Sequence, residues 1–518
     1  MWRTRHWFLG CQAQAGYWQA ELEGDSILQS ETILLLAYFG KEDSPLARKL
    51  AARLVETQLP EGGWAMYPGG KLEISGSVKA YFALKLTGHD PSEEPMIRAR
   101  NAIMAAGGAD RVNSFTRFYL ALLGQIPYSI CPSVPPEIMY LPKWFPVNLY
   151  ALSSWSRTMV VPLSIISARK PVRELPPERG IRELFLAPPE RWPANRKPGS
   201  PERPPLVSWD RFFRLVDRTI KLFERARLLP GRERAVRAAE RWMLAHFEGS
   251  DGMGAIYPPI VWSMIALDAL GYAWDSPEME YNRKQLFDLV IEEDESARVQ
   301  PCLSPVWDTA IAVRALSHGG LDLDHAALRR AVTWLLDKQI RRPGDWSETV
   351  AAEPGGWCFE HHNDFYPDCD DTAMVLLALQ DQYRRETPLK DAVPPDYAVT
   401  GDGSEPTTDD IPGKETILER MPEAVERGMK WLLAMQNSDG GWGAFDRNND
   451  REFLCHIPFA DHNAMIDPST PDLTGRVIEA LGCLGLTREH PSVAKAVAYL
   501  RRSQEADGSW YGRWGVNY

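Results

Sequence analysis

Cysteine is scarce in this sequence, and its few copies are scattered. None of them forms a Cys-x-x-Cys pair or a Cys–His pattern with zinc-ligand spacing, so neither a structural zinc site nor a disulfide framework is indicated. The seven are Cys11, Cys131, Cys302, Cys358, Cys369, Cys455 and Cys483. We expect a reducing, cytoplasmic setting, because proteins kept there rarely depend on disulfide bonds.

Long apolar runs are also missing. The best candidate, residues 33–39, is only seven residues long, whereas a helix needs about 20 to cross a bilayer. The sequence turns polar soon after Trp7-Phe8-Leu9, so we expect no signal peptide. Any contact with a membrane should therefore involve one face of the protein only.

An excess of positive charge is absent too. The formal net charge is −12, which argues against a nucleic-acid partner bound through a general basic surface. Aromatic residues, by contrast, are plentiful, with 19 Trp, 17 Tyr and 17 Phe. They could fill ordinary cores or line a cavity, and composition alone leaves both interpretations open. The length of 518 residues predicts more than one domain.

The chain contains an internal repeat, in which Gln is followed four residues later by Gly-x-Trp. Each copy follows an amphipathic segment such as 331–339 or 429–436, which predicts a helix that stops at the Gly while the Trp packs back. The Gln can donate to carbonyls left unpaired at that helix end. Four regular copies and a looser fifth are Gln12/Trp18, Gln58/Trp64, Gln436/Trp442, Gln504/Trp510 and Gln339/Trp346.

A second kind of segment usually follows each copy. It begins with a small or polar residue and continues as an apolar helix that ends in Ala-Leu, as in 308–316, 371–379 and 472–481. Such helices belong inside, and the amphipathic ones belong outside. Strand signals are weak throughout. The sequence therefore predicts an all-α fold in which outer and inner helices alternate around a ring, an α/α toroid.

Three stretches depart from the repeats. Residues 171–205, rich in proline and charge, predict an extended connection, and residues 390–414 predict a flexible surface insertion without a function. The segment 209–223 predicts an amphipathic helix. Its apolar face contains Phe212, Leu215, Val216, Ile220 and Phe223, with Lys and Arg opposite. This pattern fits a helix packed on a core as well as a helix on a membrane surface.

The most informative motif is the acidic run Asp368-Cys369-Asp370-Asp371 at the start of a predicted helix. One Asp would suffice to cap that helix. Three carboxylates this close cannot all ionise cheaply, so at least one should keep its proton at a raised pKa and serve as an acid. A Mg²⁺ site for a diphosphate is the alternative. The order Asp-x-Asp-Asp and the lack of a basic clamp argue against it, and we expect no metal.

This run, continued by Thr372-Ala373, resembles the Asp-x-Asp-Asp-Thr-Ala box of class II terpene cyclases, and the Gln…Gly-x-Trp copies resemble their QW repeats. Five further segments resemble squalene–hopene cyclases in particular and follow in the same order along nearly the whole chain. They are residues 134–139, 304–309, 343–346, 456–459 and 508–518. The chain is thus identified as a member of the squalene–hopene cyclase family. Oxidosqualene cyclases keep a single acid in the box, so the full run points to an alkene rather than an epoxide.

The resemblance implies two α/α barrels around an apolar cavity. We expect residues 1–25 to pack as an N-terminal helix on the second barrel, residues 26–303 to form the first barrel, and residues 304–518 to form the second. A patch near 206–230 would attach the protein to the cytoplasmic face of the bacterial cell membrane as a monotopic protein. Family members extend beyond the position matched by Tyr518, so the second barrel is expected to be incomplete.

The resemblance also implies a reaction: protonation of a terminal alkene of squalene, then cationic polycyclisation to hopene and hopanol without a cofactor. Asp370 would donate the proton, and Asp368 and Asp371 would carry the compensating negative charge. Three further matched residues complete the implied catalytic set. They are Asp308 beside Trp307, Asp472 as an acid supporting the donor, and Arg476 where the family has a His. A permanent cation there would affect how the donor regains its proton.

Other matched positions are expected to line the cavity or to order the water that ends the reaction. Aromatic faces stabilise cations without offering a nucleophile. The expected cavity positions are Trp307, Phe359, Tyr366, Trp155, Phe445 and Trp514. At the water end, the matched residues are Glu31, Arg117 and the segment Ile256-Tyr257-Pro258, in which Tyr257 replaces a Gln.

Three alternatives stay open. A class II cyclase for another polyprenyl chain would share the same acid box. Prenyltransferase β subunits form similar toroids, but their zinc ligands, an Asp, a Cys and a His, do not stand out here. An inactive, binding-only relative is compatible with the expected shortening. The resemblance further allows a homodimer.

Overall fold

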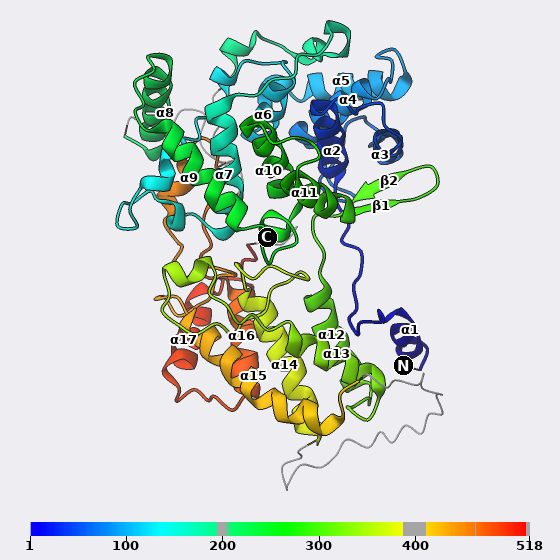
Figure 1. Cartoon of the computed structure of the whole chain (residues 1–518), viewed down its shortest axis with the longest axis vertical. Helices are drawn as coiled ribbons and strands as arrows, with labels where there is room; N and C mark the ends of the chain where they lie inside the picture. Colours follow the sequence, from blue (N-terminus) through cyan, green and yellow to red (C-terminus); the bar gives the residue numbers. More distant parts are fainter. Residues whose placement is uncertain (1, 194–204, 206, 387–410, 461–462, 514–518) are drawn as a thin grey trace.

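Two bodies of helices lie one above the other in Figure 1, each with its own hydrophobic core. The computed structural model describes residues 2–193, 205, 207–386, 411–460 and 463–513. Within these ranges the only strands are β1 (Val290–Glu292) and β2 (Ala297–Val299), which pair antiparallel. The prediction of an all-α fold is confirmed.

The upper body is a ring of buried helices surrounded by outer ones. The inner helices are α2 (Ser26–Tyr38), α4 (Ile74–Leu86), α6 (Ser114–Leu122), α7 (Ser154–Arg169) and α10 (Tyr257–Leu270). They are apolar on nearly all sides, and α10 packs against both α7 and α2. The outer helices are α3 (Pro45–Glu56), α5 (Glu94–Ala105), α8 (Trp209–Arg225), α9 (Arg232–Ala245) and α11 (Pro277–Asp288).

The lower body repeats this arrangement with fewer helices. Its inner helices are α12 (Pro305–His318), α14 (Cys369–Glu386) and α16 (Pro471–Cys483), with α14 between the other two. Its outer helices are α13 (Ala326–Asp337), α15 (Lys414–Ala434) and α17 (Pro491–Ser503). The alternation of inner and outer helices read from the sequence is therefore present in both bodies.

Each repeat forms a turn that fastens one outer helix to the next. In the regular copies the Trp indole N–H donates to a carbonyl ten residues earlier, as Trp442 does to Leu432 at 2.7 Å. The Gln does not donate to its own helix end as expected, because that carbonyl is taken by the indole. Gln436 donates instead to Gly440 in the turn and to Ser492 in the first turn of α17, each at 2.9 Å. Gly440 adopts φ +98°, and a Cβ there would lie 2.6 Å from the carbonyl oxygen of Lys495.

The looser fifth copy is corrected by the structure. Gln339 donates to the carbonyl of Gly355, and the indole of Trp357 donates to Leu335 on α13 at 2.7 Å. Trp357 therefore fills the place expected for Trp346. The repeat was misassigned because an insertion separates this Gln from its tryptophan, and a shorter match lay inside the insertion.

Two segments cross between the bodies. The N-terminal helix α1 (Trp2–Cys11) lies beside α12 and α13 in the lower half of Figure 1, and the buried Trp18 belongs to the lower core. In the other direction, six residues of the lower body belong to the upper core: Leu454, Cys455, Phe459, Ala460, Met465 and Ile466. These crossings bring the start of α7 next to loops of the lower body.

The segments that departed from the repeats are only partly described. Residues 171–193 form an extended connection interrupted by three short 3₁₀ turns at Pro177–Arg179, Arg182–Leu184 and Pro189–Arg191. Most of the expected insertion at 390–414 lies outside the described residues. Among the helices of the described chain, none is both long enough and apolar enough to span a membrane.

Candidate active site

The acidic run lies where α14 begins, close to a loop of the neighbouring repeat. Asp368 precedes the helix, and its Oδ1 accepts the backbone N–H of Asp370 at 2.6 Å, as a helix-capping Asp does. The N–H of Cys369 donates to the carbonyl of Ala444 at 2.8 Å. Helix capping thus explains why Asp368 is present, but it does not explain Asp370 or Asp371.

Burial raises the pKa of all three carboxyls. The side chains of Asp368 and Asp371 are buried, and their pKa values lie well above the usual range because they are desolvated and because neighbouring carboxylates repel further negative charge. Asp370 is more accessible, with 28% of its side chain exposed. Burial raises its pKa as well, against the charge and hydrogen bond of Arg476. The cluster can therefore hold protons at a pH where ordinary carboxyls are ionised.

Arg476, on α16, pairs with Asp370 and also faces an aromatic ring. Its guanidinium binds Oδ2 of Asp370 and lies 4.9 Å from the ring centre of Trp307. Oδ1 of Asp370 is buried and accepts no hydrogen bond from the described residues. The charge of the exposed Asp472, in the first turn of α16, favours the protonated form of Asp370. The structure therefore gathers three of the expected residues around one carboxyl.

Trp307 and Phe359 form an aromatic pair beside the acidic run. Their ring centres are 6.4 Å apart, and both side chains are partly exposed. Asp308, expected to work with Trp307, has a structural set of contacts instead. Its Oδ2 accepts hydrogen bonds from the backbone of Ala20 and from the hydroxyl of Ser304, both at 2.8 Å. It fastens the N-terminal segment to the start of α12.

A second aromatic pair joins the two bodies. Trp155 on α7 and Phe445 in the lower body meet edge to face, with ring centres 5.0 Å apart. Tyr366 lies two residues before the acidic run and is buried, and its hydroxyl donates to Asp345 at 2.9 Å. Trp514, the remaining expected aromatic, lies outside the described residues.

A cavity of about 420 Å³ extends from Trp155 into the upper body. Its walls are mainly apolar and include Ile256 and Pro258, as expected for the water end, together with Glu31. Lys79, which was not among the expected site residues, also lines the cavity and binds Oε1 of Glu31 at 2.5 Å. A lysine in the middle of the mainly apolar stretch 74–86, well before Lys85 near its end, was the signal that could have revealed it.

Two residues expected at the water end do not line this cavity. Tyr257 is fully buried behind it, and its hydroxyl contacts Thr32 at 2.8 Å and donates to the carbonyl of Leu28 at 3.0 Å. Arg117 donates to the carbonyl of Pro193 at 2.7 Å, and its guanidinium lies 5.7 Å from the ring of Trp192. Arg117 therefore supports the proline-rich connection near Pro193, at the end of its described part.

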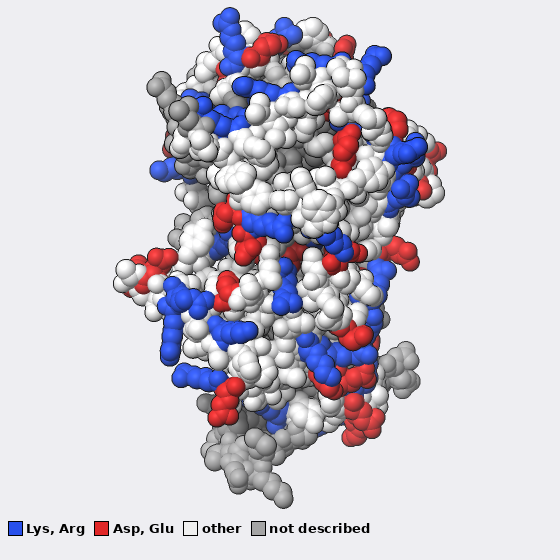
Figure 2. Space-filling model, turned by 90° about the vertical axis from the view of Figure 1, so that its left-hand side faces the viewer, with Lys and Arg blue, Asp and Glu red and all other residues white. Residues whose placement is uncertain are grey.

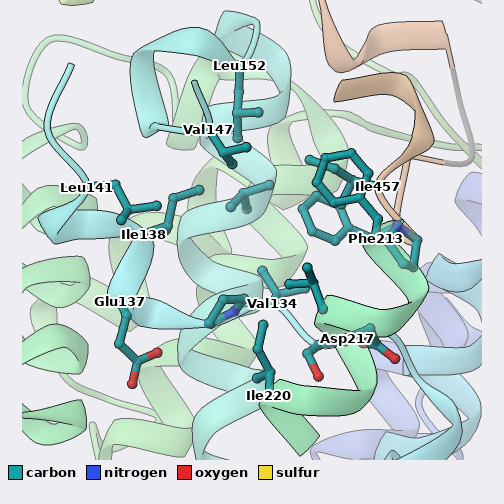
Figure 3. Close-up of a pocket in the computed structure, with 16 residues that line it drawn as sticks. Val134, Glu137, Ile138, Leu141, Val147, Leu152, Phe213, Asp217, Ile220 and Ile457 are labelled. Carbon is teal, nitrogen blue, oxygen red and sulfur yellow. Dashed lines mark hydrogen bonds between the residues drawn. The ribbon is translucent and has the colours of Figure 1, made fainter. Parts of the chain in front are cut away.

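A smaller cavity of about 160 Å³ lies between α8 and the turn Pro136–Tyr140 (Figure 3). Its walls are apolar except at one end, where the carboxylates of Glu137 and Asp217 lie. Val160 and Phe459 line both this cavity and the larger one.

Comparisons with known proteins agree over nearly the whole chain. A model of the squalene-hopene cyclase N-terminal domain matches residues 1–295, and one of the C-terminal domain matches residues 303–395 and 412–518. The chain is 38% identical to the squalene–hopene cyclase of Zymomonas mobilis over 518 residues, covering 98% of this chain and 73% of that protein.

Two more distant relatives widen the comparison. Identity is 36% over 520 residues with the squalene–hopene cyclase of Alicyclobacillus acidocaldarius, covering 100% of this chain and 76% of that protein. It is 35% over 527 residues with the dammaradiene synthase of Dryopteris crassirhizoma, covering 100% and 71%. The chain belongs to the squalene–hopene cyclase family.

Proposed function

We propose that this protein cyclises squalene to hopene, and that it forms hopanol as a hydrated side product. The observation that carries the proposal is a cluster of buried carboxyls, with raised pKa values, that meets an aromatic pair. Relatives at 36–39% identity named squalene–hopene cyclase support the choice of substrate and product. The hydro-lyase activity follows because the last cation of the cyclisation can be attacked by water instead of losing a proton.

Asp370 is the proposed proton donor. Its Oδ1 accepts no hydrogen bond from the described residues, so it can carry the proton while Oδ2 is held by Arg476. The proton adds to the CH carbon of the terminal alkene, whose π electrons form the new C–H bond and leave a tertiary cation on the carbon that bears the two methyl groups. The raised pKa values of Asp368 and Asp371 favour protons shared within the cluster over two fixed negative charges.

The aromatic pairs provide the environment that the cation needs. Each ring closure uses the π electrons of the next alkene and moves the positive charge along the chain. The faces of Trp307 and Phe359 would stabilise the first cations, and Trp155 with Phe445 would stabilise later ones without forming bonds to them. Every step is acid–base or cationic chemistry, so the proposal calls for no metal or cofactor.

The far end of the larger cavity offers a place to end the reaction. Glu31 is held there by Lys79 and by the hydroxyl of Tyr119 at 3.1 Å. Loss of a proton from a methyl group next to the last cation gives the alkene. Attack by water followed by loss of its proton gives the alcohol. The carboxylate and ammonium are the polar groups best placed to order that water.

We also propose attachment to one face of a membrane through α8. Its side chains that are at least half exposed include Trp209, Phe212, Leu215 and Leu222, although the ring of Trp209 also packs on Phe453, with 5.1 Å between ring centres. The face of the molecule toward which α8 projects presents a mostly uncharged area in its upper half (Figure 2). The smaller cavity lies directly beneath α8, so an apolar lipid could enter from the bilayer.

Charge supports the same orientation. The acidic residues of α8 are engaged by the body of the protein, as in the ion pair of Glu224 with Lys170 at 3.0 Å. On the other flank, Arg218 and Arg225 are exposed and have no ion-pair partner among the described residues. Such cations suit the anionic headgroups of a bacterial membrane, at its cytoplasmic face. A homodimer is compatible with this attachment.

One incubation tests the proposal. Detergent-solubilised protein is supplied with squalene, and extracted products are analysed by gas chromatography and mass spectrometry. Pentacyclic hydrocarbon and alcohol are expected from the wild type and not from Asp370→Asn. If only a geranylgeranyl or C35 chain were turned over, the proposed substrate would be wrong and the proposed acid-initiated mechanism would stand. Equal product from Asp370→Asn would overturn the donor assignment.

A further inference from the structure

A buried arginine of the upper body reaches two carboxylates of the lower body. Arg157 lies on α7, and its side chain is only 1% exposed. Its Nη2 donates to Oδ1 of Asp446 at 2.7 Å, and its Nε lies 3.3 Å from Oδ2 of Asp345. A single guanidinium therefore links α7 to two separate loops, both of which lead to residues of the proposed active site.

The first loop carries Phe445. Oδ2 of Asp446 accepts the backbone N–H of Ser154 at 2.7 Å, and its Oδ1 accepts from Arg157. One carboxylate therefore binds α7 just before and just after Trp155 and Ser156. The residue before Asp446 is Phe445, and the residue after Ser154 is Trp155. The contact between these two rings, 5.0 Å between centres, is thus fastened on both sides by the same ion pair.

The second loop leads to the acidic run. Oδ2 of Asp345 accepts the hydroxyl of Tyr366 at 2.9 Å, and its Oδ1 lies 2.9 Å from Nε2 of His246. The guanidinium of Arg157 lies 5.9 Å from the ring of Tyr366. Because Tyr366 directly precedes Pro367-Asp368, this branch fixes how the chain enters the acidic run.

Electrostatics explain why this arrangement has one stable geometry. Burial opposes ionisation of Asp345, but the hydrogen bond from His246 and the charge of Arg157 hold its pKa below the usual range. A planar guanidinium presents its N–H groups in fixed directions, so Arg157 can donate to Asp446 while it keeps its positive charge close to Asp345. Without it, two buried carboxyls would lose their shared cation, and the loops would be free to move apart.

We propose that Arg157 is a positioning residue that sets the Trp155–Phe445 pair at a fixed place relative to the acidic run. This inference rests on the proposed cyclisation. A cation formed midway along the squalene chain lies against that aromatic pair only if the two loops keep their positions relative to each other. When the pair is displaced, the cation loses a proton from an adjacent carbon before the remaining rings close, and a partly cyclised alkene results.

The variants Arg157→Met, Arg157→Lys and the double variant Arg157→Met/Asp446→Asn test this role. The double variant removes the charges as a pair, which protects folding if the single change leaves Asp446 unsatisfied. The ratio of partly cyclised to pentacyclic product should rise by roughly tenfold or more in Arg157→Met, the size expected when one charge-assisted hydrogen bond is lost. Arg157→Lys keeps the charge but reaches one carboxylate, so it should restore part of the ratio.

Arg314 provides the matched control. It also bridges two carboxylates, Asp381 at 3.2 Å and Glu479 at 3.3 Å, but lies within the lower body. Arg314→Met should lower thermal stability and leave the product ratio unchanged. An unchanged ratio in folded Arg157→Met and in the double variant would overturn the inference.

A second readout does not depend on turnover. Hydrogen exchange at the amides of Ser154 and residues 444–446 should accelerate in Arg157→Met and Arg157→Lys but not in Arg314→Met. Unchanged exchange in the two Arg157 variants would contradict the positioning role even if the product were altered. A wild type that gives no cyclised product, with exchange altered as expected, would instead count against the proposed function alone.

Discussion

The guanidinium of Arg476 binds Oδ2 of Asp370 and at the same time lies over the ring of Trp307, 4.9 Å from its centre. A permanent cation is thus built into the place where the first carbocation is proposed to form. Its charge opposes the effect of burial on the pKa of Asp370. Burial and Arg476 therefore act on the pKa of Asp370 in opposite directions: burial raises it, and the guanidinium lowers it.

Arg476→Gln should move the pH dependence of squalene turnover. The donor must be protonated, so turnover falls as pH rises through the pKa of the cluster. Without the nearby cation that pKa rises further, so the alkaline limb should shift upward while the maximal rate falls because the acid is weaker. Rates measured from pH 5 to 9 check this. Arg420→Gln, on the outer helix α15, is the control, and a profile unchanged by Arg476→Gln would contradict the account.

Asp371→Asn should stabilise the protein while stopping catalysis. The pKa of Asp371 is raised by burial, so the native state binds its proton more tightly than the unfolded state does. Its contribution to stability is present below pH 4 or so and is lost as pH rises toward the folded pKa. Removing the carboxyl should therefore raise stability at pH 8. Thermal unfolding at pH 8 measures this, and a lower melting temperature would contradict it.

Glu360 should make stability depend on pH near neutrality. It is fully buried, and burial raises its pKa to about 8. The unfolded chain releases this proton near pH 4.5, so stability decreases as pH rises from there and stops decreasing above about pH 8, with a slope of at most about 1.4 kcal/mol per unit for one proton. Glu360→Gln should flatten the dependence across that window. The exposed Glu353→Gln should not, and equal slopes in the two variants would refute the assignment.

Leu215→Gln/Leu222→Gln should release the protein from membranes. These exposed side chains of α8 are proposed to enter the bilayer interface, where each contributes on the order of 1 kcal/mol or more. Partitioning onto vesicles that contain anionic phospholipid should fall by roughly tenfold or more. Ile97→Gln/Ile311→Gln removes two exposed apolar side chains elsewhere and serves as the control. Equal partitioning of both variants would argue against α8.

Much of the fold could be predicted from sequence because the repeats have a local cause. The turn that contains Gly440 and packs Trp442 back onto the end of α15 depends on residues close in sequence, and so does the alternation of apolar and amphipathic helices. The tryptophan that pairs with Gln339 could not be found in this way. Its hydrogen bond to Leu335 spans an insertion that the repeat pattern does not describe.

The candidate site was less accessible to sequence reasoning where contacts join distant segments. The acidic run is contiguous, so its role as an acid could be predicted from crowding alone. Arg157 and Asp446 are 289 positions apart, and neither belongs to a recognisable motif. The partner of Asp308 turned out to be the backbone of Ala20, which the resemblance could not show. The role of Lys79 could not be recognised because a lysine in a helix, like Lys85 in the same one, is easily taken for a surface residue.

The most direct test of the account is cyclisation of squalene in D₂O. If an exchangeable carboxyl starts the reaction, the hydrocarbon product should contain a single deuterium per molecule, located on a methylene carbon of the first ring, because the CH carbon of the terminal alkene takes up the proton. Asp370→Asn should give no product. Pentacyclic product without deuterium, or labelled product from Asp370→Asn at the wild-type rate, would contradict the central claim that this carboxyl protonates the substrate.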